Sequence, residues 1–170
     1  MKRYYMENKF SLFGDYKYNI YNESKEPVYI ATENRFLGLI DRFLGAIAGI
    51  GHRIFIKDLN GNELFSIKKQ WAILRRDFDI ILVDNTCITV REGSAFKKPE
   101  ITVISPNGKY MIIGDIMARD FSVKKDDVTV STIKVKSNNF LKYYQIIVIE
   151  DDFDSIAIAA AFIVDNTYHI

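Results

Sequence analysis

Few residues in this chain have the types and spacing that catalysis or metal binding requires. The two histidines, His52 and His169, are far apart, and no Gly-x-Ser-x-Gly elbow is present to carry a serine nucleophile. No pair of cysteine or histidine residues has the spacing of zinc ligands. We therefore expect no catalytic residue, no bound metal and no cofactor, and we expect the protein not to be an enzyme.

Two segments rich in carboxylates superficially suggest cation binding. The segment DLNGNE, at 58–63, has its glycine too early for a calcium loop, and Lys69 stands where the closing glutamate would be. We interpret it as a hairpin turn. The segment EDDFD, at 150–154, could hold calcium, but acids at a helix start also favour the positive end of the helix dipole. We favour helix capping there and keep calcium as the alternative; the carboxylates are those of Glu150, Asp151, Asp152 and Asp154.

Adjacent basic residues recur at predicted strand ends and turns. If several pairs meet at one rim of the fold, they could hold a phosphorylated headgroup through charge-assisted hydrogen bonds. Solvated hairpin ends explain the same pairs, and nearby acids such as Asp77, Glu92 and Asp126 dilute their charge. As candidate residues for binding an anionic headgroup we name Lys68, Lys69, Arg75, Arg76, Lys97, Lys98, Lys124 and Lys125.

Composition limits the class of protein. A length of 170 residues predicts one domain, 1–170, and 48% hydrophobic with 14% aromatic residues favours a compact β-rich fold. The net charge of +1 gives no global field that would attract nucleic acid or a membrane, so an electrostatic partner must be recognised by a local patch. We expect no nucleic-acid partner.

The single cysteine and the N-terminal residues bear on localisation. Cys87 cannot form an intramolecular disulfide, and we expect it to be a small buried side chain in a strand of a protein from a reducing compartment. The start MKRYYMENKF lacks the apolar run of a signal peptide, and no stretch reaches the ~18 apolar residues that span a bilayer. We expect a cytoplasmic protein that is at most peripheral to the membrane.

Short strands joined by tight turns dominate the chain as far as about residue 150. Turn signals recur at Asn60-Gly61, at Asp84-Asn85, at 106–108 and at Asp126-Asp127, each between two apolar stretches. About eleven or twelve strands connected in this way predict an antiparallel meander and exclude a βαβ fold.

The chain then ends in a segment with no polar side. From Ile156 to Val164 every residue is isoleucine, alanine, phenylalanine or valine, and a helix that is apolar all round must be buried on all sides. A barrel of about twelve strands has a lumen that must be filled, and a helix about 10 Å across fits it. We predict a closed antiparallel barrel with a central helix over residues 152–164.

A longer apolar segment, RFLGLIDRFLGAIAGIG, precedes the strand that begins near His52. At 100° per residue its large apolar side chains fall on one stripe, which predicts an amphipathic helix near 36–50 that is too short to span a bilayer. We expect the stripe to pack on the barrel; the alternative is that it meets a membrane or a second copy of the protein. The stripe consists of Phe36, Ile40, Phe43, Ile47 and Ile50.

The order of these segments resembles the LURP-one-related family, specifically its small bacterial branch. The resemblance covers the whole chain and lies in YYMENKF, YKYNIYNESKEPVYIA, IKDLNGNELFSIKK, FSVKKDDVTVSTIKVK and AAFIVDNTYH. It implies the fold of the tubby C-terminal domain and the phospholipid scramblases, a twelve-stranded barrel around a helix. The apolar insertion departs from the short connection that is usual in the family.

The resemblance also bears on function, because tubby domains bind phosphoinositides and scramblase-like proteins associate with membranes. We expect a non-enzymatic binding domain that docks on membrane surfaces or anionic phospholipid headgroups. The alternative is a protein-interaction or structural module that binds a protein partner, or itself, through the insertion at 36–50.

Overall fold

The computed structural model of the chain describes residues 1–9, 17–33, 53–70, 77–93, 99–115, 117–138 and 141–168. These residues form twelve strands and one helix. The strands are β1 (Lys2–Lys9), β2 (Lys17–Tyr21), β3 (Pro27–Glu33), β4 (Arg53–Asp58), β5 (Glu63–Lys69), β6 (Asp77–Leu82), β7 (Cys87–Glu92), β8 (Glu100–Ser105), β9 (Gly108–Gly114), β10 (Asp120–Lys125), β11 (Val128–Asn138) and β12 (Leu141–Val148), and the helix is α2 (Asp154–Tyr168).

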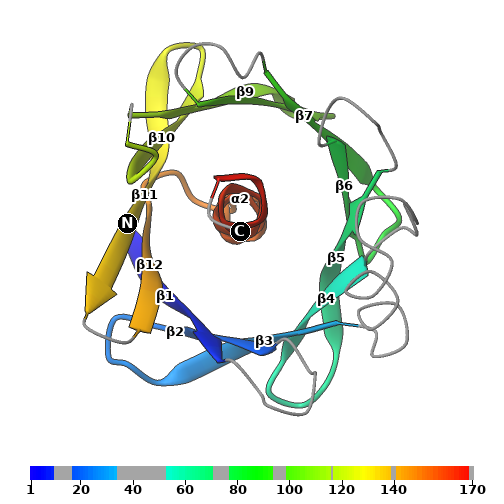
Figure 1. The fold of residues 1–170 in the computed structure, drawn as a ribbon. Helices are drawn as coiled ribbons and strands as arrows, with labels where there is room; N and C mark the ends of the chain where they lie inside the picture. Colours follow the sequence, from blue (N-terminus) through cyan, green and yellow to red (C-terminus); the bar gives the residue numbers. More distant parts are fainter. Residues whose placement is uncertain are drawn as a thin grey trace, which may run out of the picture.

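The strands form one closed antiparallel barrel (Figure 1). Each strand pairs with the next one along the chain, and β1 pairs with β12, with Lys2 opposite Val148, to close the circle. Among the twelve described strands, closure therefore leaves none at the edge of an open sheet. The predicted antiparallel barrel of about twelve strands is therefore confirmed.

Tight turns connect the strands at one end of the barrel, which we call the turn end. They follow β2, β4, β6, β8 and β10, and include the predicted turns at Asn60-Gly61, Asp84-Asn85 and Asp126-Asp127. Asn85 and both aspartates of the last turn have positive φ, a conformation that Asn and Asp tolerate better than most residues. DLNGNE is one of these turns, since the Asp58 carboxylate accepts a hydrogen bond from the backbone N–H of Asn62 at 2.8 Å.

Helix α2 runs through the middle of the barrel, starting at the turn end (Figure 1). From Ile156 to Val164 every side chain is buried against inward-facing strand residues such as Ile80 and Ile112. The alternation of buried and exposed residues along the strands gives the barrel this apolar inner wall. The central helix predicted from its all-round apolarity is confirmed.

The helix bounds differ from the predicted 152–164. The helix begins at Asp154, because Asp152 has a φ of 61° and belongs to the turn that brings the chain over the mouth of the barrel. It continues past Val164 to Tyr168, because the first polar residue, Asp165, finds hydrogen-bond partners inside the barrel. The amphipathic helix predicted near 36–50 lies outside the described residues.

Candidate binding surfaces and the anchored helix

A buried carboxylate anchors the end of α2. Asp165 is 8% exposed and accepts hydrogen bonds from the Tyr18 hydroxyl at 2.7 Å, from the Tyr144 hydroxyl, and from the Lys142 ammonium at 2.8 Å. A negative charge is unfavourable near the C-terminus of a helix, so these donors must offset both burial and the helix dipole. The group ties α2 to β2 and β12, two strands on one side of the barrel.

A similar group anchors the start of α2. The Asp154 carboxylate accepts a hydrogen bond from the Tyr4 hydroxyl at 2.7 Å and forms an ion pair with the Lys2 ammonium, also at 2.7 Å. Here the helix dipole favours the charge, because Asp154 lies in the first turn. Each end of α2 is thus held by an aspartate that accepts hydrogen bonds from tyrosine and lysine. All four carboxylate oxygens have partners, so we assign both aspartates a structural role.

The anchoring groups change the acidity of their tyrosines. Burial raises the pKa of Tyr144, and the neighbouring Asp165 charge adds to the effect. Burial likewise raises the pKa of Tyr4, with a further contribution from its hydrogen bond to Asp154. Both hydroxyls therefore stay protonated in the folded protein at pH values where a free tyrosine ionises.

We expect the free energy of unfolding to fall steeply above pH 10. In the unfolded chain both tyrosines ionise near their ordinary pKa of 10.0, whereas the folded protein retains their protons. The folded state then binds more protons, and each tyrosine lowers stability by up to about 1.4 kcal/mol per pH unit. Denaturant unfolding at pH 8, 10 and 11 measures the slope. Tyr144→Phe should make it shallower, and an unchanged slope in that variant would contradict the role of Tyr144.

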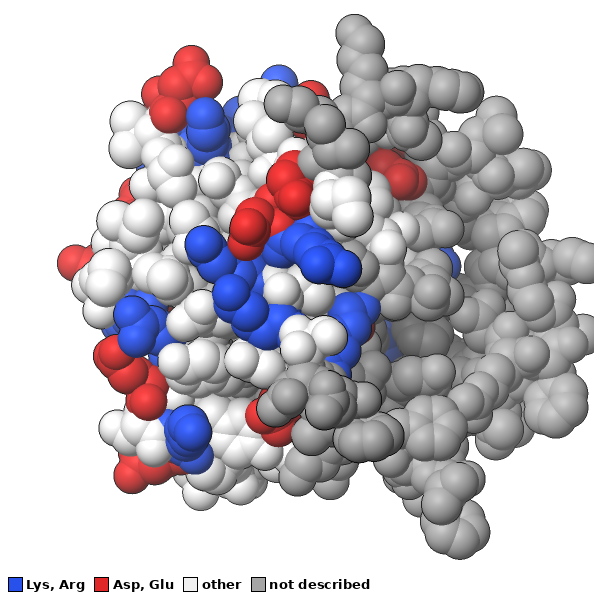
Figure 2. Space-filling model, turned by 60° about the vertical axis from the view of Figure 1, so that its left-hand side comes forward, with Lys and Arg blue, Asp and Glu red and all other residues white. Residues whose placement is uncertain are grey.

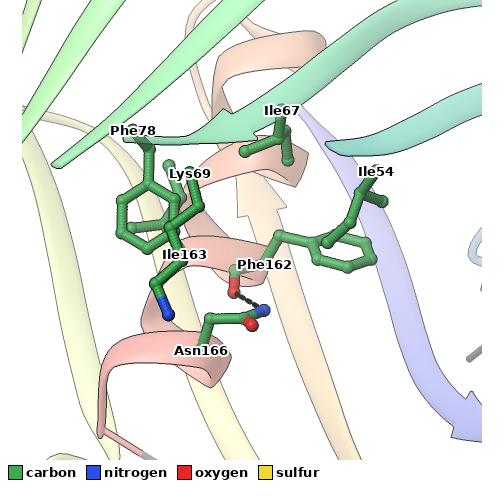
Figure 3. A pocket seen from close by; sticks show the side chains of 7 residues that line it. All are labelled: Ile54, Ile67, Lys69, Phe78, Phe162, Ile163 and Asn166. Carbon is green, nitrogen blue, oxygen red and sulfur yellow. Dashed lines mark hydrogen bonds between the residues drawn. The ribbon is translucent and has the colours of Figure 1, made fainter. Parts of the chain in front are cut away.

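The lumen of the barrel offers little room for a ligand. Between α2 and β4–β6 remains a cavity of about 10 Å³, close to the size that admits one water molecule (Figure 3). Ile54, Ile67 and Phe78 line it from the strands, and Phe162 and Asn166 line it from the helix. The described interior of the barrel is therefore largely filled by side chains of the strands and of α2.

The structure divides each described lysine pair between the two sides of the barrel wall. Lys68 is exposed on the outside, whereas Lys69 points inward and lines the cavity beside α2 (Figure 3). Lys124 faces outward, whereas the Lys125 ammonium lies 5.5 Å from the centre of the Tyr110 ring and 3.6 Å from the Glu150 carboxylate. Successive residues of a strand face opposite sides, so adjacent lysines in a strand do not add their charges on one surface.

The two described pairs also lie at opposite ends of the barrel. Lys124 and Lys125 adjoin the turn end, and Lys68 and Lys69 lie at the other end, where β5 stops. Arg75, Arg76, Lys97 and Lys98 lie outside the described residues. The same holds for the apolar stripe of Phe36, Ile40, Phe43, Ile47 and Ile50, so a role for these residues stays a prediction. Both histidines, for which no role is expected, also lie outside the described residues.

A basic surface that the sequence analysis did not single out covers the outside of β9–β12; we call it the basic face. Its outward-facing charged residues are four lysines, Lys109, Lys124, Lys134 and Lys136, and one acid, Asp120, which lies 3.9 Å from Lys134. Figure 2 shows this side of the barrel, where basic side chains gather near the middle, with acidic side chains directly beside them and others at the edge.

The neighbouring wall of the barrel has the opposite balance. On β6–β8 the outward-facing charged residues are the acids Asp77, Asp79 and Glu100 and one base, Arg91. The near-neutral net charge of +1 thus hides a separation of charge across the surface. The basic face is a local patch of positive charge, the feature that recognition of an electrostatic partner would require.

Two tyrosines border the basic face. The rings of Tyr5 and Tyr143 lie on the outer wall with their centres 6.5 Å apart, and Tyr143 is the cross-strand partner of Lys136. Both side chains are partly exposed. Tyrosine is common where a protein meets the headgroup layer of a membrane, since its ring is apolar and its hydroxyl polar.

Cys87 does not occupy the buried position expected from the sequence. It is exposed on the outer wall, because Ile88 and Val90 take the inward positions of β7. Partial burial raises the pKa of its thiol, and the nearby Asp79 charge raises it further. The thiol therefore has little thiolate character at neutral pH, as is usual for an unreactive cysteine.

The acidic segment at 150–154 is dispersed in space. Glu150 pairs with Lys125, Asp154 belongs to the helix anchor, and Asp151 and Asp152 are exposed in the turn. Within the described ranges, no group of three or more His, Cys, Asp or Glu side chains is placed to hold a metal ion. Among the helices of the described residues, none has the length and apolarity needed to cross a membrane.

A closed antiparallel barrel filled by its own C-terminal helix is the class of fold that these observations define. The model of the LURP-one-related family matches residues 2–165, nearly the whole chain, and the protein belongs to this family. No curated protein matches the sequence, and no solved structure does.

Proposed function

We propose that this protein is a non-catalytic binding domain that docks on anionic membrane surfaces through the basic face. The observation that supports the proposal is the excess of outward-facing lysines on β9–β12, four against one aspartate. A lysine near an anionic bilayer contributes about 1 kcal/mol of attraction. Four lysines would then give about 4 kcal/mol, which corresponds to weak, reversible, salt-sensitive binding.

The rest of the described structure is compatible with this role. The helix fills the lumen, so the domain presents its surface and not an interior site. The Tyr5 and Tyr143 rings could enter the headgroup layer beside Lys136. We propose the cytoplasmic leaflet as the target, since it carries the anionic lipids and the single cysteine suits a reducing compartment.

Charge reversal on the basic face tests the proposal. We expect Lys124→Glu combined with Lys136→Glu to lower partitioning onto phosphatidylserine vesicles at least about thirtyfold, since two attractive charges are lost, worth about 2 kcal/mol. Neither lysine has a described carboxylate within ion-pairing distance, so thermal stability should change little. Vesicle co-sedimentation and thermal unfolding give the two measurements.

Lys57→Glu with Lys68→Glu is the matched control. These lysines face outward on β4 and β5, six strands around the barrel from β10 and β11, and they have the same degrees of exposure as Lys124 and Lys136. The control has the same net charge but should retain most of the binding. Equal loss in both variants would refute docking through the basic face, and no binding of the parent protein would refute the function.

A further inference from the structure

We infer that the basic face responds to the density of negative charge on a surface and does not select one lipid headgroup. The inference rests on the proposed function and specifies its partner: a fluid anionic bilayer as a whole. It follows from three features of the described residues, namely the placement of the lysines on the strands, the pairing of the backbone donors and the charges that line the recess beside the face.

The lysines of the basic face come from three neighbouring strands, β9, β10 and β11. No two of the four are cross-strand partners: Lys124 lies opposite Met111 and Thr129, and Lys136 lies opposite Tyr143. Lys134 and Lys136 are two residues apart on one strand, roughly 6.6 Å at 3.3 Å per residue, with parallel side chains. The register thus places no two of these lysines directly opposite each other, the arrangement in which cross-strand side chains come closest.

The paired backbone and the side-chain types of the four strands favour general attraction over recognition of one headgroup. Each strand of the face pairs with a neighbour on both sides within the closed barrel, which engages the N–H groups of the paired residues in the sheet; on the β10 side the pairing of β11 ends at Lys134. The sequences of β9, β10, β11 and β12 contain no arginine, the residue that recognises phosphate through two parallel hydrogen bonds. Lysine acts as a point charge, which responds to potential more than to shape.

The recess that adjoins the face is also unsuited to a headgroup. It lies at the turn end, where Lys125 stands between Asp126 and Glu150 and is already paired with the latter. An anion entering it would meet two carboxylates and one ammonium that is neutralised. The lysines on the open wall, together with the exposed Arg119 that directly precedes β10, are described groups of this region that can attract a negative surface.

Vesicles matched for surface charge test the inference. Phosphatidylserine and phosphatidylinositol 4,5-bisphosphate vesicles, adjusted to equal zeta potential, should bind the protein with affinities within about threefold of each other, and soluble inositol trisphosphate at micromolar concentration should not compete. Tenfold preference for the phosphoinositide at matched potential, or competition by the soluble headgroup, would overturn charge-density recognition while leaving membrane docking intact. Failure to bind either vesicle would instead overturn the proposed function.

Moving one charge along the face gives a second, independent test. Lys136→Gln should weaken binding to phosphatidylserine vesicles about fivefold, and adding Thr132→Lys should restore it, because Thr132 faces outward on the same strand. Vesicle binding recovers in this way only if it depends on the number of lysines on the face and not on their exact positions. A double variant that stays as weak as Lys136→Gln would show that position matters and would refute the inference.

Discussion

Replacement of Ala160 by glutamate is expected to abolish cooperative folding. Ala160 is 1% exposed in the middle of α2, where the barrel wall surrounds the helix on all sides. The new carboxylate would be buried without a partner, at a cost of several kcal/mol, and its added volume would strain the packed lumen. Because a domain of this kind is stable by only about 5–15 kcal/mol, most of that margin would be lost. Circular dichroism during heating should show no sharp transition.

The same substitution near the helix start provides the control. Ser155 is partly exposed in the first turn of α2, where the helix dipole favours an acid, so Ser155→Glu should melt close to the parent. A chain truncated before Asp151 should also fail to fold, since the inner wall would line an empty lumen. A cooperative melt of Ala160→Glu within a few degrees of the parent would contradict the enclosure of α2.

Removal of the Asp165 carboxylate should have the second largest effect. Asp165→Ala leaves the hydroxyls of Tyr18 and Tyr144 and the Lys142 ammonium without their shared acceptor. Breaking a buried ion pair from one side typically costs about 3–5 kcal/mol. Denaturant unfolding should therefore show a lower midpoint with little change in its slope, because the surface exposed on unfolding stays nearly the same.

Two comparisons distinguish the loss of the hydrogen bonds to Asp165 from the general effect of removing a carboxylate. Asp154→Ala removes the equivalent carboxylate at the more exposed end of α2, and it should cost only about 1–2 kcal/mol. Adding Tyr18→Phe, Tyr144→Phe and Lys142→Met to Asp165→Ala should recover part of the loss, because no buried donor is then left unpaired. An Asp165→Ala protein as stable as the parent would show that the anchor is dispensable.

Local chemistry explains why much of the fold was predictable. Turn residues such as Asn60-Gly61 and Asp84-Asn85 favour tight turns through their own backbone preferences, whatever the rest of the chain does. An apolar stretch such as Ile156–Val164 can only be buried, and a barrel of twelve strands is the element available to enclose it. The arrangement follows from signals that lie within a few residues of one another.

The anchors of α2 could not be found in this way, because their members are distant in sequence. Tyr18 is 147 residues from Asp165, and Tyr4 is 150 residues from Asp154. Their meeting depends on the closure of the barrel and on how far the helix reaches into it. One signal was present: an aspartate that directly follows an apolar helical stretch requires buried donors, and inward-facing tyrosines are candidates for them.

The basic face shows how strand periodicity should guide the search for charged surfaces. Adjacent pairs such as Lys124-Lys125 draw attention in a sequence, but their side chains leave the strand on opposite sides. Lys134 and Lys136 alternate with Ile133 and Val135, which are partly or fully buried, and this spacing places both lysines outside. A search for alternating charges would have found the face.

The pairing of β1 with β12 has a consequence for how the protein is made. A ribosome adds about 5–20 residues per second. Roughly 8–30 s therefore pass between the synthesis of β1 and the synthesis of its partner strand β12 and of the central helix. Throughout that interval the nascent sheet has two unpaired edges and an uncovered apolar surface, which are the features that chaperones bind and that promote aggregation. Completion of the fold is therefore delayed until β12 and α2 have left the ribosome.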